Sequence, residues 1–203
     1  MSDERYERSA RLGERENISP LLGFFRRIES LKQLVRTGWV FRKIPEAKAE
    51  SVADHKWSTM MMADTLTAKY APHLDRGKVV RMLMVHELGE IEDGDVRNPT
   101  ITDAAARHRN ERAGVIKVLG DLHNREEYLA LWDEFEAKQT PEAQWARQID
   151  RLEFYMQFSA YHERGYIPAE VLKGKGAITD PNLVSFLNEV LAAHDRELAA
   201  PGI

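Results

Sequence analysis

The segment Val79-Val-Arg-Met-Leu-Met-Val-His-Glu-Leu-Gly-Glu90 decides the fold class, because a helical apolar pattern runs directly into two polar residues. Val79 and Leu83 are four positions apart, and this spacing places both side chains on one face of an α-helix. The apolar run leads into the adjacent pair His86-Glu87. The segment therefore predicts a helix in the core that presents an imidazole and a carboxylate side by side.

Apolar residues recur with the same helical spacing along almost the whole chain, whereas the period-two alternation typical of β-strands is nearly absent. The sequence therefore predicts an all-α fold. The charged residues 1–18 are expected to form a loosely packed tail, and residues 19–200 a single helical domain. Helices are expected from Pro20 to Leu31 with the Arg36-Thr37-Gly38-Trp39 turn ending this segment, around His55 as far as Pro72, from Asp75 into the His86-Glu87 pair, from Ala104 to Leu119, around Tyr128 to Phe135, from Thr140 through Asp150, and from Pro181 to Leu198.

Composition limits the classes of partner. The chain has 203 residues, 43% of them hydrophobic, which is enough to bury one core. Its formal net charge of -4 argues against binding to a nucleic-acid duplex, and the lack of cysteine excludes a thiolate metal site. The N-terminal segment lacks the apolar run of a secretory signal, and no later stretch reaches the ~20 apolar residues needed to cross a bilayer. We therefore expect a soluble cytoplasmic protein with no membrane partner.

Four polar residues in apolar, helix-patterned stretches are candidate metal ligands: His55, His86, Glu87 and Asp150. Two imidazoles and two carboxylates suit a divalent ion such as Mn, Fe, Co, Ni or Zn, and such a site activates water. In a helical bundle, side chains from facing helices can converge on one ion. Asp150 has an alternative explanation, because Arg147 or Arg151 on the same helix could neutralise it.

The string His86-Glu87-Leu-Gly-Glu90 resembles the beginning of the zincin protease motif, in which two histidines one turn apart flank a glutamate. Its fifth residue is Glu90 rather than histidine, so a zincin-type protease is disfavoured and the extra carboxylate needs another role. Glu90 lies four positions after His86 and is expected on the same face of the helix. Asp95 follows in an acidic, turn-rich loop that should cross the surface near the site.

Four short stretches carry a family resemblance when they are taken in order over about residues 31 to 165. They are Leu34-Val-Arg-Thr-Gly-Trp-Val-Phe-Arg42, Glu50-Ser-Val-Ala-Asp-His55, Val85-His-Glu-Leu-Gly-Glu90 with Gly94-Asp95 after it, and Gln148-Ile-Asp-Arg-Leu-Glu153. Together they resemble the HD-domain metal-dependent phosphohydrolases, and most closely the 5'-deoxynucleotidase branch that includes the HD-domain-containing protein 2 group.

The resemblance implies an all-α, single-domain HD-type bundle with a metal site between core helices. It also implies a metal-dependent phosphomonoesterase that hydrolyses (deoxy)nucleoside 5'-monophosphates and associates as a homodimer. The residue roles implied are metal ligation of one divalent ion (Mn, Co, Fe, Ni, Zn or Mg) by His55, His86, Glu87 and Asp150, general acid or base catalysis by Glu90, a second carboxylate near the attacking water at Asp95, and substrate binding by Arg36 and Trp39. An arginine can bind phosphate through two parallel hydrogen bonds. For the tryptophan, packing on a sugar or base and ordinary core burial are both open.

One residue departs from the family pattern, since the acid of the eponymous His-Asp pair is Glu87 here and is one methylene longer. Two alternatives follow. The chain could be a nucleotide-binding or sensing protein with weak or no catalysis, or an HD-type hydrolase or di-iron oxygenase acting on another small phosphorylated substrate. A second metal would need further histidines between the His-acid pair and Asp150, and only His108 and His123 lie there. That scarcity favours a single ion.

Overall fold

The computed structural model of the chain describes residues 18–93, 104–167 and 178–199. In these ranges every regular secondary-structure element is a helix, and the β-structure is limited to one isolated bridge between Val35 and Ser51. The all-α prediction is therefore confirmed. The predicted tail, apart from residue 18, and the candidate Asp95 lie outside the described residues.

The helices agree closely with the sequence pattern. They are α2 (Pro20–Ile28), η1 (Glu29–Lys32), α3 (Thr37–Phe41), η2 (Glu46–Lys48), α4 (Val52–Tyr70), α5 (Arg76–Val85), α6 (Glu90–Asp93), α7 (Ala104–Leu119), α8 (Arg125–Ala137), α9 (Pro141–Glu163) and α10 (Pro181–Ala199). In the described part of the chain, no helix is both long and apolar enough to cross a membrane.

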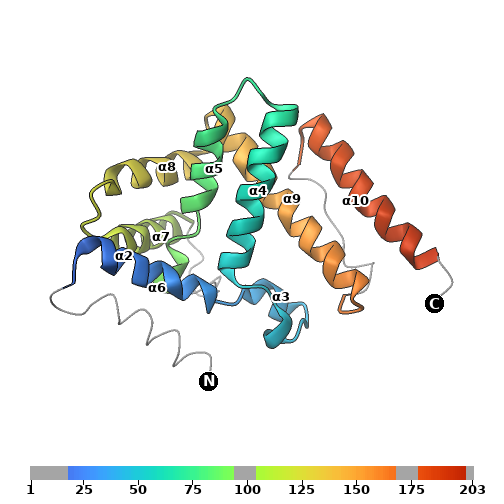
Figure 1. Cartoon of the computed structure of the whole chain (residues 1–203), viewed down its shortest axis with the longest axis horizontal. Helices are drawn as coiled ribbons and strands as arrows, with labels where there is room; N and C mark the ends of the chain where they lie inside the picture. Colours follow the sequence, from blue (N-terminus) through green and yellow to red (C-terminus); the bar gives the residue numbers. More distant parts are fainter. Residues whose placement is uncertain (1–17, 94–103, 168–177, 200–203) are drawn as a thin grey trace.

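Helices α4, α5 and α9 form the centre of the molecule (Figure 1), and each packs against the other two. Helix α10 packs along α9, while α8 packs against both α5 and α9. The side chains with no exposed surface at the centre come from all three central helices: Val52, Ala63, Val79, Met82, Leu83, Ile149 and Leu152. The three helices that carry the candidate ligands are thus held together by one hydrophobic core.

Two N-caps fix where the ligand-bearing helices begin. The hydroxyl of Ser51 accepts a hydrogen bond from the backbone N–H of Asp54, whose carboxylate accepts one from the Ser51 N–H in return. Such a capping box satisfies two of the donors at the start of α4. In α9, Thr140 caps the helix through its hydroxyl, and Pro141 occupies the first position, as the sequence predicts. His55 therefore lies in the first turn of α4.

The segment from Arg36 to Trp39 was expected to be the turn that ends the first helix, and this prediction is wrong. Helix α2 ends at Ile28, and Thr37 instead begins the short helix α3. The cause is backbone pairing across the Val35–Ser51 bridge. The Arg36 N–H donates to the Glu50 carbonyl at 3.0 Å, and the Val52 N–H donates to the Leu34 carbonyl at 2.8 Å.

The central helix also differs from the sequence pattern at the His-acid pair. Helix α5 ends at Val85, His86 is its C-cap, and the backbone N–H of Glu90 bonds to the carbonyl of Glu87, three residues back. The expected alignment of His86 and Glu90 on one continuous helix is therefore wrong. A β-carbon on Gly89 would lie 2.8 Å from the backbone oxygen of Glu111 in α7, so this turn packs too closely for a side chain.

Candidate metal centre

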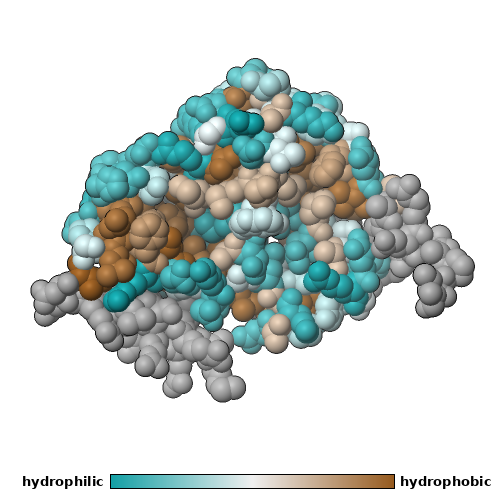
Figure 2. Space-filling view, viewed as in Figure 1, coloured by the Kyte–Doolittle hydropathy of each residue, from teal (hydrophilic) through white to brown (hydrophobic). Residues whose placement is uncertain are grey.

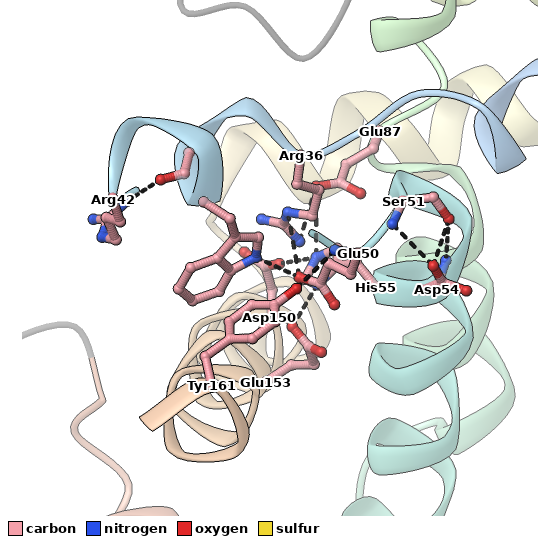
Figure 3. Close-up of polar contacts among 12 residues, drawn as sticks. Arg36, Arg42, Glu50, Ser51, Asp54, His55, Glu87, Asp150, Glu153 and Tyr161 are labelled. Atoms are coloured by element: carbon pink, nitrogen blue, oxygen red, sulfur yellow. Dashed lines mark hydrogen bonds and ion pairs between the residues drawn. The ribbon is translucent and has the colours of Figure 1, made fainter. Parts of the chain in front are cut away.

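His55 forms the middle of a cluster of polar side chains between the central helices (Figure 3). Its side chain has no exposed surface. The Nε2 atom lies 3.0 Å from Asp150 Oδ1 and 3.5 Å from Glu87 Oε1. Asp150 reaches the imidazole from α9, and Glu87 reaches it from the turn after α5. Glu87 and Asp150, the latter 95 positions from His55 in the chain, therefore converge on one ring.

His86 completes the cluster from the end of α5. Its Nε2 atom lies 3.5 Å from Asp150 Oδ1 and 3.7 Å from Glu87 Oε1. The indole of Trp132 donates a hydrogen bond of 3.1 Å to the backbone carbonyl of His86 and fixes the main chain where the helix ends. One ligand atom from each of the four candidate residues lies within 4.8 Å of the others.

The alternative partner of Asp150, an arginine on its own helix, is not what the structure shows. Arg147 pairs with Glu136 at 3.1 Å, and the guanidinium of Arg151 lies over the ring of Phe154 at 4.6 Å. Asp150 instead faces the two imidazoles. Although burial works in the opposite direction, the hydrogen bond from His55 and the nearby His86 imidazole hold the pKa of Asp150 well below its usual range.

The donor set and its spacing fit a divalent ion. Metal–ligand bonds of about 2.0–2.2 Å place neighbouring donor atoms roughly 2.9–3.6 Å apart in tetrahedral or octahedral geometry. Three of the four histidine–carboxylate distances, 3.0, 3.5 and 3.5 Å, fall within that spacing, and the fourth, 3.7 Å, lies just above it. Two buried atoms of the cluster, His86 Nε2 and Glu87 Oε2, have no hydrogen-bond partner among the described residues. An ion would use these lone pairs, which are otherwise costly to bury.

In both histidines the Nδ1 atom, which faces away from the cluster, has a bonding partner, and this contact orients Nε2 toward the cluster. His86 Nδ1 lies 2.8 Å from the backbone carbonyl of Leu83. His55 Nδ1 lies 2.5 Å from Glu153 Oε2, and the Glu153 side chain is 2% exposed. A proton on each Nδ1 leaves each Nε2 free to bind a metal, and such outer partners increase the basicity of the ligand.

Glu153 was not assigned a role by the sequence, although it belongs to a stretch that carries the family resemblance. Two signals could have found it. It follows Asp150 by three positions, which places both carboxylates on the same side of α9, and it falls among the buried residues of that helix. A carboxylate in such a stripe needs a partner, and the His55 imidazole provides one.

Replacing Glu153 by Gln is expected to weaken Mn²⁺ binding by about 10- to 100-fold, because a neutral amide supports His55 less strongly than a carboxylate. Isothermal titration calorimetry of the metal-free protein measures the change. Glu163→Gln is the matched control, since Glu163 is exposed at the end of the same helix and accepts a hydrogen bond only from Ser159 in the described part of the chain. Equal affinities for Mn²⁺ in the Glu153 variant and the control would contradict the role of Glu153.

The negative charges around His55 make metal binding depend on pH, because they stabilise the protonated form of its imidazole. Burial disfavours the protonated imidazole, but Glu87, Asp150 and Glu153 outweigh it and raise the pKa of His55 to about 10. A metal ion must displace this proton from His55, so metal binding releases a proton and weakens as the pH falls.

Arg36, for which the family resemblance implies substrate binding, lies at the edge of the cluster. Its Nη1 atom is 3.9 Å from Glu87 Oε1, and its Nε atom is 3.8 Å from Glu50 Oε1. Nη1 is buried and has no hydrogen-bond partner among the described residues. The guanidinium therefore has donor capacity directed at the site, held in place by two carboxylates.

Trp39 occupies the core, which was the alternative that the sequence left open. Its side chain is 2% exposed, its ring stacks on Phe154 at a centroid distance of 4.9 Å, and its indole N–H donates to Glu50 Oε1 at 2.7 Å. With its ring packed against Phe154 and its N–H bonded to Glu50, Trp39 holds Glu50, which in turn pairs with Arg36. Direct packing on a substrate does not fit this position.

Lys56 is a second residue that sequence reasoning missed. It follows His55 in α4, is 6% exposed, and lies four positions after the buried Val52. Burial lowers the pKa of Lys56 to about 8, against the opposing attraction of the Glu87 and Glu90 carboxylates. Glu90 itself is half-buried at the start of α6.

Comparisons with known proteins agree with this geometry. Residues 28–175 match the model of the HD domain family. The 5'-deoxynucleotidase HDDC2 of Danio rerio is 29% identical over 90% of this chain and 92% of its own, and that of Bos taurus is 30% identical over 88% of each. The crystal structure of a predicted metal-dependent phosphohydrolase from Magnetospirillum magnetotacticum MS-1 superposes with a TM-score of 0.59 at 26% identity, covering 87% of this chain and 92% of that one. The matched residues include the histidine and carboxylate cluster, and the chain belongs to the HD domain family.

Proposed function

We propose that the chain is a metal-dependent phosphomonoesterase that hydrolyses (deoxy)nucleoside 5'-monophosphates to nucleoside and phosphate. The observation that carries the proposal is the convergence of four ligand atoms within 4.8 Å beside the guanidinium of Arg36. The names of the relatives, 5'-deoxynucleotidases in several species, support the choice of substrate.

His55, His86, Glu87 and Asp150 would hold one divalent ion. Such an ion supplies Lewis-acid activation of water and of a phosphoryl oxygen. Arg36 binds the phosphate through its guanidinium, whose planar fork of donors suits two oxygens at once. Glu90 takes the proton from water or gives one to the leaving 5'-oxygen. Asp95, which lies outside the described residues, keeps the predicted role of a second carboxylate near the water.

A single ion suits the arrangement better than the pair that an oxygenase would need. His108 is exposed on α7 and stacks on Trp132, and neither it nor His123 belongs to the described groups of potential ligands. The other such group consists of Glu50, His55 and Glu153. This group shares His55 with the first group. Its two carboxylates already have partners, since Glu153 bonds to His55 Nδ1 and Glu50 accepts a hydrogen bond from Trp39.

The activity is tested with a panel of ribo- and deoxynucleoside 5'-monophosphates, each with added Mn²⁺, Co²⁺ or Mg²⁺, by measuring released phosphate. Turnover of at least one monophosphate that chelation with EDTA abolishes and metal restores is the expected result. Nucleotide binding without phosphate release from folded, metal-loaded protein would contradict the hydrolase and favour the sensing alternative.

We also propose a cytoplasmic homodimer in which two copies meet through α2. Leu21, Leu22 and Phe25 are exposed on this helix, and Figure 2 shows apolar surface on the side of the molecule where α2 lies. A cluster of large exposed apolar side chains is typical of an interaction surface. Sedimentation at micromolar concentration should give twice the chain mass of 23.3 kDa, and a monomer mass would contradict the dimer.

A further inference from the structure

The ammonium of Lys56 is buried and has no hydrogen-bond partner among the described residues. Lys56 lies near the start of α4, directly after His55, on the stripe that buries Val52, Thr59 and Ala63. A lysine in such a stripe normally extends its ammonium to solvent or pairs it, because an unpaired buried charge is costly.

The charges that act on this ammonium are those of the site itself. Glu87, Glu90 and Asp150 attract it, and Arg36 repels it. None of the three carboxylates forms a hydrogen bond with Nζ. Because Lys56 directly follows the candidate ligand His55 in α4, it is a second cation near the cluster in addition to Arg36. Lys56 Nζ and Arg36 Nη1 are both buried donor atoms that have no hydrogen-bond partner among the described residues.

We infer that Lys56 binds the phosphoryl group of the substrate together with Arg36, and that a phosphate oxygen accepts the hydrogen bonds that its buried ammonium lacks. Phosphate is the fitting ligand because a compact, buried ammonium forms strong charge-assisted hydrogen bonds with an anionic oxygen. The inference rests on the proposed function in taking a phosphomonoester as the substrate. Two cations in addition to a divalent ion suit the double negative charge of a monoester better than the single charge of a diester.

The test measures binding at equilibrium, so that it does not depend on turnover. Inorganic phosphate is titrated into Mn²⁺-loaded protein by calorimetry, for the parent chain and for Lys56→Met, which keeps the length of the side chain without its charge. The variant should bind phosphate about 10- to 100-fold more weakly, the size expected for loss of a hydrogen bond to a charged group. Its Mn²⁺ affinity should stay equal or rise, because a positive charge beside the ligand carboxylates is removed.

A loss of phosphate affinity without a loss of Mn²⁺ affinity distinguishes phosphate binding by Lys56 from a structural role, because a structural defect would weaken Mn²⁺ binding as well. Lys69→Met is the matched control, because Lys69 is an exposed lysine near the end of the same helix, and its phosphate affinity should equal that of the parent. Lys56→Gln serves as a second uncharged variant if the methionine variant melts at a lower temperature than the parent.

The outcomes distinguish the inference from the proposed function. Phosphate affinity within twofold of the parent in a folded Lys56 variant overturns the inference, as does a parallel loss of Mn²⁺ and phosphate binding. A parent protein that does not bind phosphate also overturns it. A parent protein that binds phosphate but releases none from any monophosphate contradicts the proposed function alone.

Discussion

Replacing Asp150 by Asn is expected to lower the rate of phosphate release by at least about 1,000-fold and to remove the metal. The carboxylate faces both imidazoles, with Oδ1 at 3.0 Å from His55 Nε2 and 3.5 Å from His86 Nε2. Asparagine keeps the shape but loses the charge that balances a divalent ion. Loss of Lewis-acid activation removes several kcal/mol of transition-state stabilisation, and each ~1.4 kcal/mol corresponds to a tenfold change in rate. Steady-state rates and elemental analysis of the purified variant measure both effects.

Asp64→Asn is the control for this substitution. Asp64 is exposed on α4 and pairs with Arg76 at the surface, at 3.3 Å, so its loss should leave rate and metal content unchanged. An Asp150 variant that retains one metal per chain and a rate within tenfold of the parent would show that Asp150 is not a ligand.

Replacing Glu90 by Gln should lower kcat by about 10²- to 10⁴-fold while the metal content stays at one ion per chain, because general acid–base catalysis contributes a factor of this size. Glu90 is half-buried at the start of α6, and its carboxylate acts on Lys56 together with that of Glu87. The amide cannot accept or donate the proton, yet it is nearly the same size. Single-turnover rates with the best substrate of the nucleotide panel measure the chemical step.

Glu92→Gln is the matched control on the same short helix, where Glu92 pairs with Lys117, and it should retain the parental kcat. Loss of metal from the Glu90 variant would make Glu90 a ligand instead of a proton carrier. A kcat within tenfold of the parent would exclude it from the proton transfer altogether.

The structure brings the four candidate ligands together, and the sequence could single them out because each is exceptional in its local context. Asp150 is a carboxylate beside the buried stripe of α9, and the Thr140-Pro141 signal fixed where that helix begins. His55 lies among apolar residues at the start of α4, where the structure shows a capping box at Ser51. Local helical spacing and capping signals indicate which polar residues lie beside a buried helix face. The packing of the helices then determines that these residues meet.

Other features depend on contacts between distant segments, which spacing does not encode. The end of α5 before His86 reflects close packing of Gly89 against Glu111 in α7. The short helix that begins at Thr37 reflects backbone pairing of Arg36 with Glu50. Local pattern favoured a longer helix in the first case and a turn in the second, and tertiary contacts override such preferences.

Glu87, where the family pattern has aspartate, remains within the cluster. Its Oε1 atom lies 3.5 Å from His55 Nε2, 3.7 Å from His86 Nε2 and 3.9 Å from Arg36 Nη1. Burial works against ionisation, but the neighbouring histidines and Arg36 lower the pKa of Glu87. The longer side chain starts from a turn rather than from a helix and still directs its charge toward the two imidazoles.

The central claim is that His55, His86, Glu87 and Asp150 hold one divalent ion, and anomalous X-ray diffraction from crystals grown with Mn²⁺ tests it most directly. Data collected above and below the absorption edge should show one Mn²⁺ peak in the cluster. Both Nε2 atoms and a carboxylate oxygen of Glu87 and of Asp150 should lie about 2.0–2.3 Å from that peak. Absence of a peak between α4, α5 and α9, or a peak that Glu87 does not contact, would contradict the account.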